Sequence, residues 1–313
     1  MLASAFSILI FPGLLFCAAA GFLLSGLDRK LVARMQHRIG PPLWQNFWDF
    51  CKLLDKEVIV PSRAARRIFL SAPVVCAAAS ACCALLVPVF GICPFPGTAD
   101  VIVLIYVLTF ASAAIIIGGA ASGSVFAGVG LSRSVVAVMS YELPLVLILL
   151  AVCKAAGGQR ATFSLIQIAA YQTHEGLLLF DWRLMPAAIA MLFVIPCEVG
   201  SAPFDVAEAG IEICEGPLVE YSGWPLALFR LAHAIKTYVM SALFVALFLG
   251  ARLSGILWLD APVLLVCAAV VTIFSMTLSH AVCARLRVEQ LFALYWGPVS
   301  ALAALSLILV WFF

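Results

Sequence analysis

Long, continuously apolar runs constrain the fold of this chain more than any other feature. Eight of them reach about 20 residues, the length at which a helix crosses a bilayer; they lie near 3–26, 69–92, 100–121, 134–156, 185–203, 222–250, 256–280 and 290–312. Apolar and polar residues do not alternate within them, as they would in a membrane β-barrel. Only 11% of the 313 residues are charged. The sequence therefore predicts an all-α, polytopic membrane helical bundle of about eight transmembrane helices, in one integral membrane domain over residues 1–313.

The distribution of basic residues predicts the orientation of this bundle. Half of them lie between the first and second spans: Arg29, Lys30, Arg34, Arg38, Lys52, Lys56, Arg63, Arg66 and Arg67. The positive-inside rule makes that loop cytoplasmic, so with eight spans both termini are predicted to lie outside. The loops near 122–133, 199–221 and 281–289 then share the cytoplasmic side with it.

Within the basic loop, Leu43 to Leu54 is expected to form a short amphipathic helix at the membrane interface. Trp44 and Trp48 fall on one face of that helix, where tryptophan anchors are common. The alternative is a solvated basic loop attracted to anionic lipid.

The segment Glu198 to Gly223 is the most acidic part of the chain. It has no Lys or Arg and contains Glu198, Asp205, Glu208, Glu212, Glu215 and Glu220. If it forms a helix, the four carboxylates from 205 to 215 share one face. Their mutual repulsion would raise some pKa values, which predicts proton handling or the docking of a basic partner. A solvated acidic loop is the alternative.

Ionisable residues also occur inside predicted spans. Glu142 lies about 13 Å into its helix, where a carboxylate costs about 2.5–3.5 kcal/mol unless it is paired, hydrated or protonated. Arg230, His233 and Lys236 follow at three-residue spacing in the sixth span. We expect Lys236 to pair with Glu142 or with a member of the acidic segment, forming a chain of titratable groups. The second and third spans have almost no polar side chains and are expected to be structural.

The eleven cysteines are not expected to hold a metal. No two of them form a C-x-x-C pair, and most lie within predicted spans, where cysteine packs as a small apolar residue. No zinc or iron–sulfur site is predicted on this chain.

Several cytoplasm-facing motifs together resemble one protein family. They are PFDVAEA at 203–209, EGP at 215–217, EYSG at 220–223, the S-Y-E-x-P run Ser140, Tyr141, Glu142 and Pro144, the basic-loop residues Asp28, Gln36, Arg38, Gly40, Pro41, Asp49, Lys52, Leu53 and Leu54, and the pair Arg285 and Arg287. In combination they resemble the membrane subunit shared by respiratory complex I, the energy-converting [NiFe] hydrogenases and the formate hydrogenlyases. Gly210 departs from the pattern, since the family usually has a glutamate there. Asp28 replaces the glutamate expected in complex I.

Two features of the resemblance favour the hydrogenase branch. The connection between Gly40-Pro41 and Lys52 is short, as in hydrogenase and formate hydrogenlyase subunits, whereas the complex I form is longer. Hydrogenase-type subunits also have basic residues where this chain has Arg230 and Lys236.

The resemblance implies a non-catalytic subunit in the cytoplasmic membrane of a prokaryote. Such a subunit anchors the hydrogenase large and small subunits and a ferredoxin-like iron–sulfur subunit, abuts antiporter-like subunits and contacts lipid, with no nucleic acid. The [NiFe] centre and [4Fe-4S] clusters belong to the partners, and no cofactor is expected on this chain. The alternatives are the quinone-chamber subunit of NADH:quinone oxidoreductase, an independent ion transporter and a purely structural anchor.

The residue patterns and the resemblance together assign two groups of residues. Proton transfer and coupling are expected of Glu142, Glu198, Asp205, Glu208, Glu212, Glu215, Glu220, Arg230 and Lys236. Partner docking is expected of Asp28, Gln36, Arg38, Asp49, Lys52, Arg133, Arg285 and Arg287. In the expected mechanism, a redox change in the docked subunits alters protonation of the acidic segment, and Glu142, Arg230 and Lys236 relay it to a neighbouring pump subunit.

Overall fold

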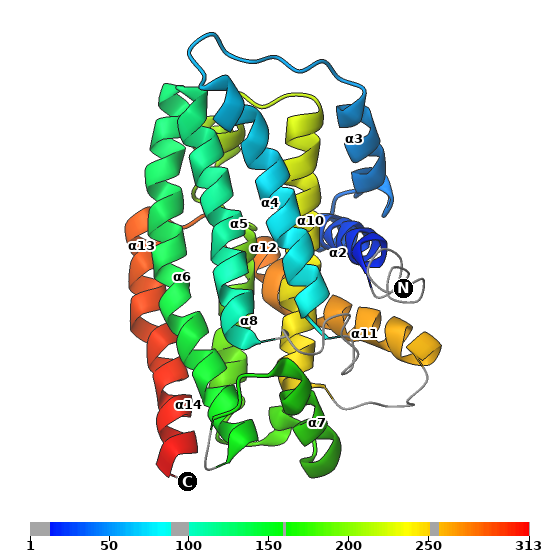
Figure 1. Cartoon of the computed structure of the whole chain (residues 1–313), viewed down its shortest axis with the longest axis vertical. Helices are drawn as coiled ribbons and strands as arrows, with labels where there is room; N and C mark the ends of the chain where they lie inside the picture. The colour runs from blue at the N-terminus through cyan, green and yellow to red at the C-terminus, as the bar shows by residue number, and fades with distance from the viewer. Residues whose placement is uncertain (1–12, 89–99, 159–160, 251–256, 313) are drawn as a thin grey trace.

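A computed structural model describes residues 13–88, 100–158, 161–250 and 257–312 of the chain, and within them the regular structure is helical (Figure 1). The α-helices are α2 (Leu14–Met35), α3 (Gln45–Leu54), α4 (Arg66–Leu86), α5 (Val101–Ser122), α6 (Val125–Gly157), α7 (Leu165–Glu175), α8 (Met185–Val199), α9 (Gly210–Ile213), α10 (Trp224–Phe248), α11 (Leu257–Thr272), α12 (Leu278–Val282), α13 (Val288–Leu294) and α14 (Ser300–Phe312). Short 3₁₀ turns lie at η1 (Leu178–Phe180) and η2 (Gly216–Leu218), and π-helical turns lie at η3 (Ile273–Thr277) and η4 (Tyr295–Val299).

The predicted membrane bundle is confirmed. Six helical stretches of the described residues are long and apolar enough to cross a membrane: α4, α5, α6, α10, α11 continued through α12, and α13 continued through α14. The apolar α8 is shorter, at 15 residues. The remaining predicted span corresponds to α2, which has charged residues in its second half. Residues 3–12 and 89–92 of the first two predicted spans, and residue 256 of the seventh, lie outside the described residues.

Two predicted boundaries are wrong in ways that affect the site. α6 begins at Val125 rather than near 134 and has 33 residues, so it is about 50 Å long and exceeds the roughly 30 Å hydrocarbon core. Arg133 therefore lies within a helix instead of a loop, and Glu142 lies near the helix centre. The first helix continues to Met35 instead of ending near 26, because Leu27, Val32 and Ala33 continue the apolar spacing.

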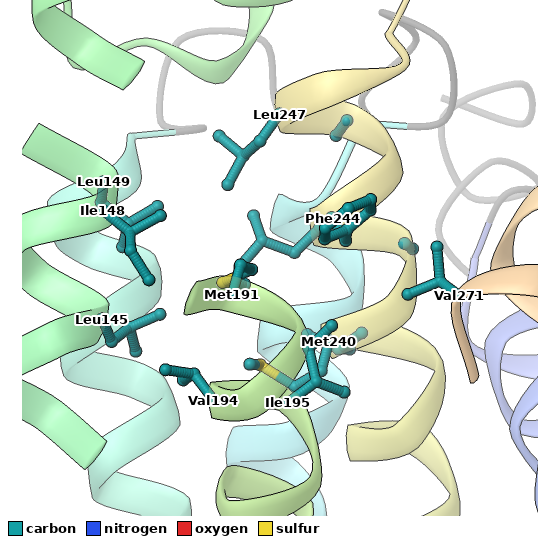
Figure 2. Close-up of a cluster of buried hydrophobic side chains, with 14 of the residues drawn as sticks. Leu145, Ile148, Leu149, Met191, Val194, Ile195, Met240, Phe244, Leu247 and Val271 are labelled. Atoms are coloured by element: carbon teal, nitrogen blue, oxygen red, sulfur yellow. The ribbon is translucent and has the colours of Figure 1, made fainter. Parts of the chain in front are cut away.

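α10 is the central helix of the bundle, in contact with α2, α4, α8 and α11. Every residue from Ala234 to Phe248 is buried, as expected for a helix that is apolar on nearly all sides, and Lys236 is the charged residue among them. Figure 2 shows part of the surrounding core, where Met240 and Phe244 of α10 lie beside Met191 and Ile195 of α8. In Figure 1, α11 lies across the long direction of the bundle.

α3 packs against the inner part of α2 through aromatic side chains. The ring of Phe22 lies 4.8 Å from that of Phe47 and 5.5 Å from that of Phe50. Trp44, which directly precedes α3, and Trp48 on α3 are exposed. The predicted amphipathic helix is therefore present, and its position at the membrane interface stays a prediction.

Candidate functional site

The acidic segment from Glu198 to Gly223 is mostly a loop, so the predicted helical stripe of carboxylates is wrong. Only the short α9 and the 3₁₀ turn η2 are helical after α8 ends. Cys214, Glu215 and Gly216 have positive φ angles of 51°, 71° and 49°, and a right-handed helix cannot continue through such residues. We call residues 200–223 the acidic loop.

Three carboxylates of the acidic loop each meet a different arginine. The pairs are Asp205 with Arg285 at 2.7 Å, Glu212 with Arg133 at 2.7 Å and Glu215 with Arg230 at 3.5 Å. They connect the loop to α6, to α10 and to the segment before α13. Because most of these side chains are partly exposed, the pairs contribute little to stability, and their main effect is to fix the position of the loop. Glu220 is half-buried and forms no ion pair among the described residues.

Because each of these carboxylates has its own arginine, the acidic loop does not share protons among a row of repelling carboxylates as expected. A hydrogen bond from Arg133 lowers the pKa of Glu212, which therefore keeps its charge. Burial raises the pKa of Glu208, the neighbouring carboxylates raise it further, and the positive charge of Arg230 partly offsets both effects. Glu208 therefore holds its proton more readily than an exposed glutamate does.

The loop also packs directly on the backbone of α6. A Cβ atom at Gly130 would lie 2.7 Å from Cδ of Pro217 and 2.9 Å from Cα of Gly216. No residue with a side chain fits there without moving the loop. At Gly128, two positions earlier on α6, a Cβ atom would meet nothing within 4 Å.

A buried ion pair lies at the inner end of the loop. Nζ of Lys236 on α10 is 2.7 Å from Oε1 of Glu198 on α8, and these side chains are only 11% and 1% exposed. The same Nζ donates a 2.8 Å hydrogen bond to Oγ of Ser112 on α5, which lies 3.5 Å from the hydroxyl of Tyr141 on α6. Four helices therefore converge on one polar cluster, and the expected pairing of Lys236 with the acidic segment is confirmed.

Two small cavities connect this cluster to the acidic loop. One, of about 40 Å³, lies among α4, α5 and α10; the other, of about 80 Å³, lies among α5, α6, α8 and the loop. Both are lined by Glu208 and Lys236, and each has room for one or a few water molecules. Glu198 and Asp205 line the larger one. Glu142 is half-buried on α6, close enough to Glu198 for electrostatic interaction.

The residues predicted for docking divide into two groups. Four have internal partners: Asp28 accepts a 2.8 Å hydrogen bond from Thr277 and lies 3.7 Å from His280, Asp49 accepts a 2.8 Å hydrogen bond from Gln45 and lies 3.4 Å from Arg29, and Arg133 and Arg285 bind the acidic loop. The other four, Gln36, Arg38, Lys52 and Arg287, are exposed. Docking by any of them stays a prediction.

Sequence reasoning missed two members of the site. Ser112 lies in a span expected to be structural, and a single serine among other small residues did not indicate a polar site. Thr277 binds Asp28 from the π-helical turn η3, a local irregularity that periodicity does not reveal. Among the described residues, no group of three or more His, Cys, Asp or Glu side chains is arranged to hold a metal ion.

Comparisons with known proteins agree with this architecture. Residues 6–311 match the family described as NADH dehydrogenase. Hydrogenase-4 component C of Escherichia coli is 36% identical over 232 residues, covering 72% of this chain and 70% of that protein. A subunit of the NADH-quinone oxidoreductase of Thermomicrobium roseum is 34% identical over 307 residues, covering 91% of this chain and 88% of that protein.

A solved structure extends the comparison to three dimensions. A chain of the membrane-bound sulfane sulfur reductase, an archaeal respiratory membrane complex, superposes with a TM-score of 0.86 at 26% identity, covering 95% of this chain and 96% of that one. With the sequence matches, this shows that the chain belongs to the NADH dehydrogenase family, as a multi-pass membrane subunit of a complex of the hydrogenase and complex I type.

Proposed function

We propose that this chain is the membrane anchor and coupling subunit of an energy-converting [NiFe] hydrogenase in the cytoplasmic membrane of a prokaryote, with both termini outside. The observation that carries the proposal is the buried Lys236–Glu198 pair, joined through small cavities to the acidic loop. A buried ion pair is a poor source of stability, and ionisable groups inside a membrane protein commonly mark an ion route.

In the proposed mechanism, the chain moves protons through its own side chains. Glu208, whose pKa is raised, takes up a proton when the docked subunits change their redox state. Protonation of Glu208 changes the charge beside Lys236 and so alters the strength of the Lys236–Glu198 ion pair. Glu142 then passes this change in charge toward the neighbouring membrane subunit. Glu212 takes no part as a carrier, because Arg133 holds it in the charged form. The ion that the complex translocates as a result is H⁺ or Na⁺.

The redox chemistry is assigned to partner subunits. Hydrogenase large and small subunits and a ferredoxin-like subunit would carry the [NiFe] centre and the [4Fe-4S] clusters, and antiporter-like subunits would lie beside this chain in the membrane. The exposed Gln36, Lys52 and Arg287 are the proposed docking residues. The similarity to a hydrogenase-4 component supports this branch.

A second candidate is the corresponding subunit of a quinone-reducing complex. It is favoured by the similarity to the NADH-quinone oxidoreductase subunit of Thermomicrobium roseum over 91% of this chain. The coupling residues would be the same, and the difference would lie in the docked subunits.

Gentle solubilisation of the tagged chain from its native membrane separates the two candidates. Co-purifying subunits are identified by mass spectrometry, and nickel is measured in the same sample. A stoichiometric hydrogenase-like large subunit with nickel supports the proposal. A nickel-free complex with flavin and quinone assigns the chain to the second candidate, and a chain that purifies alone contradicts both.

A further inference from the structure

An open basic groove lies at the C-terminal end of α2, outside the site described above. It has a volume of about 320 Å³ and is lined by Lys30, Arg34, Arg38, Ile39 and Gly40. Lys30 and Arg34 are four positions apart, so they lie on one side of α2. Arg38 follows the turn at His37, whose φ is 57°, and joins them at the end of the helix. A Cβ atom at Gly40 would lie 2.9 Å from Cβ of Ala33 and 3.1 Å from Cα of Lys30. The chain therefore folds back closely onto the helix, and its backbone forms one wall of the groove.

The positive charge of this groove is not neutralised within the described part of the chain. Lys30, Arg34 and Arg38 form none of its ion pairs, and Arg38 donates its hydrogen bond to the neutral amide of Gln36. The adjacent Arg29 differs, since it binds Asn46 and lies 3.4 Å from Asp49. The carbonyl end of a helix supplies only about half a negative charge. Three cations exceed that, so the groove attracts a further anion.

Apolar side chains beside the groove indicate what kind of anion fits. Ile39 is fully exposed and Met35 is 50% exposed, although both adjoin the basic residues. The groove lies at the end of α2 that follows its apolar part. The exposed Trp44, just before α3, and Trp48, on α3, are also nearby in the chain, since α3 packs against α2. Cations next to exposed apolar and tryptophan side chains are typical of a surface in the lipid headgroup region. An anionic phospholipid satisfies both features, with phosphate for the cations and glycerol and acyl carbons for the apolar side chains.

We propose that the groove binds the phosphodiester headgroup of an anionic phospholipid. Lys30, Arg34 and Arg38 contact the phosphate oxygens, and Ile39 and Met35 contact the adjoining lipid carbons. Arg38 thereby acts in lipid binding rather than in docking a subunit. This inference does not depend on the proposed function, because it concerns the membrane that surrounds the chain in any complex.

The test measures lipid binding to the delipidated, detergent-solubilised complex by native mass spectrometry. Phosphatidylglycerol and phosphatidylcholine are titrated separately onto the wild type, onto the variant Arg34→Gln/Arg38→Gln and onto the control Arg66→Gln/Arg67→Gln. The control removes the same charge from exposed residues at the start of α4. We expect one tightly held phosphatidylglycerol per chain, bound about 25-fold more weakly by the groove variant, from about five-fold per charge, with no change in the control.

The same spectra report subunit composition and so distinguish other occupants. Equal phosphatidylglycerol affinity in all three proteins overturns the proposal. Loss of a subunit from the groove variant, with lipid binding unchanged, assigns the groove to a protein partner. Displacement of the lipid by millimolar inorganic phosphate assigns it to free phosphate. If the double variant does not assemble, Arg34→Gln alone is expected to weaken lipid binding about five-fold.

Discussion

Removal of the Lys236 ammonium group is expected to destabilise the bundle strongly. In Lys236→Met, Glu198 loses a cation 2.7 Å away while its side chain stays 1% exposed. Removing one partner of a buried pair typically costs about 3–5 kcal/mol, because the remaining charge is left without compensation. The hydrogen bond to Ser112 is lost as well.

The double variant Lys236→Met/Glu198→Gln is expected to recover most of that loss. Both charges are removed, the new side chains have similar size, and replacing a buried pair by neutral groups is often neutral or stabilising. Lys236 and Glu198 should therefore show a coupling free energy of about 3 kcal/mol or more in a double-mutant cycle, because the double variant avoids the cost of a buried charge without a partner. The control Lys56→Met makes the same change at an exposed lysine and should behave as the wild type.

Thermal unfolding of the purified complex in detergent measures these differences. We expect Lys236→Met to lower the unfolding midpoint by roughly 5–10 °C, from a loss of about 3 kcal/mol, and the double variant to unfold within a few degrees of the wild type. A Lys236→Met variant as stable as the wild type would refute the reasoning. A double variant whose unfolding midpoint falls by the sum of the decreases in the two single variants would refute it as well.

Three further predictions concern the acidic loop. Gly130→Ala should displace the loop from α6 and lower thermal stability, whereas Gly128→Ala should not, because only the first added methyl group meets the loop. The variant Glu208→Gln should be as stable as the wild type below pH 4.5 and more stable than the wild type as pH rises above it. The reason is that the raised pKa of Glu208 makes its ionised form unfavourable in the folded state. A stability difference that does not depend on pH would contradict this. Gly210→Glu should assemble and fold normally, because Gly210 is exposed and its Cβ atom would meet nothing within 4 Å; an unfolded variant contradicts the described loop.

The sequence predicted those features of the structure that depend on the residues of a single helix. Apolar runs identified the bundle, and the depth of Lys236 within its span predicted a partner in Glu142 or in the acidic segment, where the structure has Glu198. These predictions succeeded because the cost of an uncompensated charge in an apolar environment does not depend on topology.

Contacts between distant segments were beyond the reach of sequence patterns. Arg133 and Glu212 are 79 positions apart, and Arg285 and Asp205 are 80 apart, so no local spacing relates them. The prediction that the carboxylates from 205 to 215 share one helical face was wrong for a different reason. The left-handed turn around Glu215 depends on how the loop packs against α6. The glycine and proline at 216 and 217 were a local signal for that break.

Ion movement by the double variant Lys236→Met/Glu198→Gln tests the central claim most directly. Hydrogen turnover and ion uptake are measured together in inverted membrane vesicles supplied with a low-potential electron donor, with the wild type and Lys56→Met as references. We expect turnover close to that of the wild type but ion uptake no greater than with an uncoupler present, because the titratable pair is gone while the bundle stays folded. A double variant that moves ions at the wild-type ratio to turnover would contradict the role of this pair in coupling.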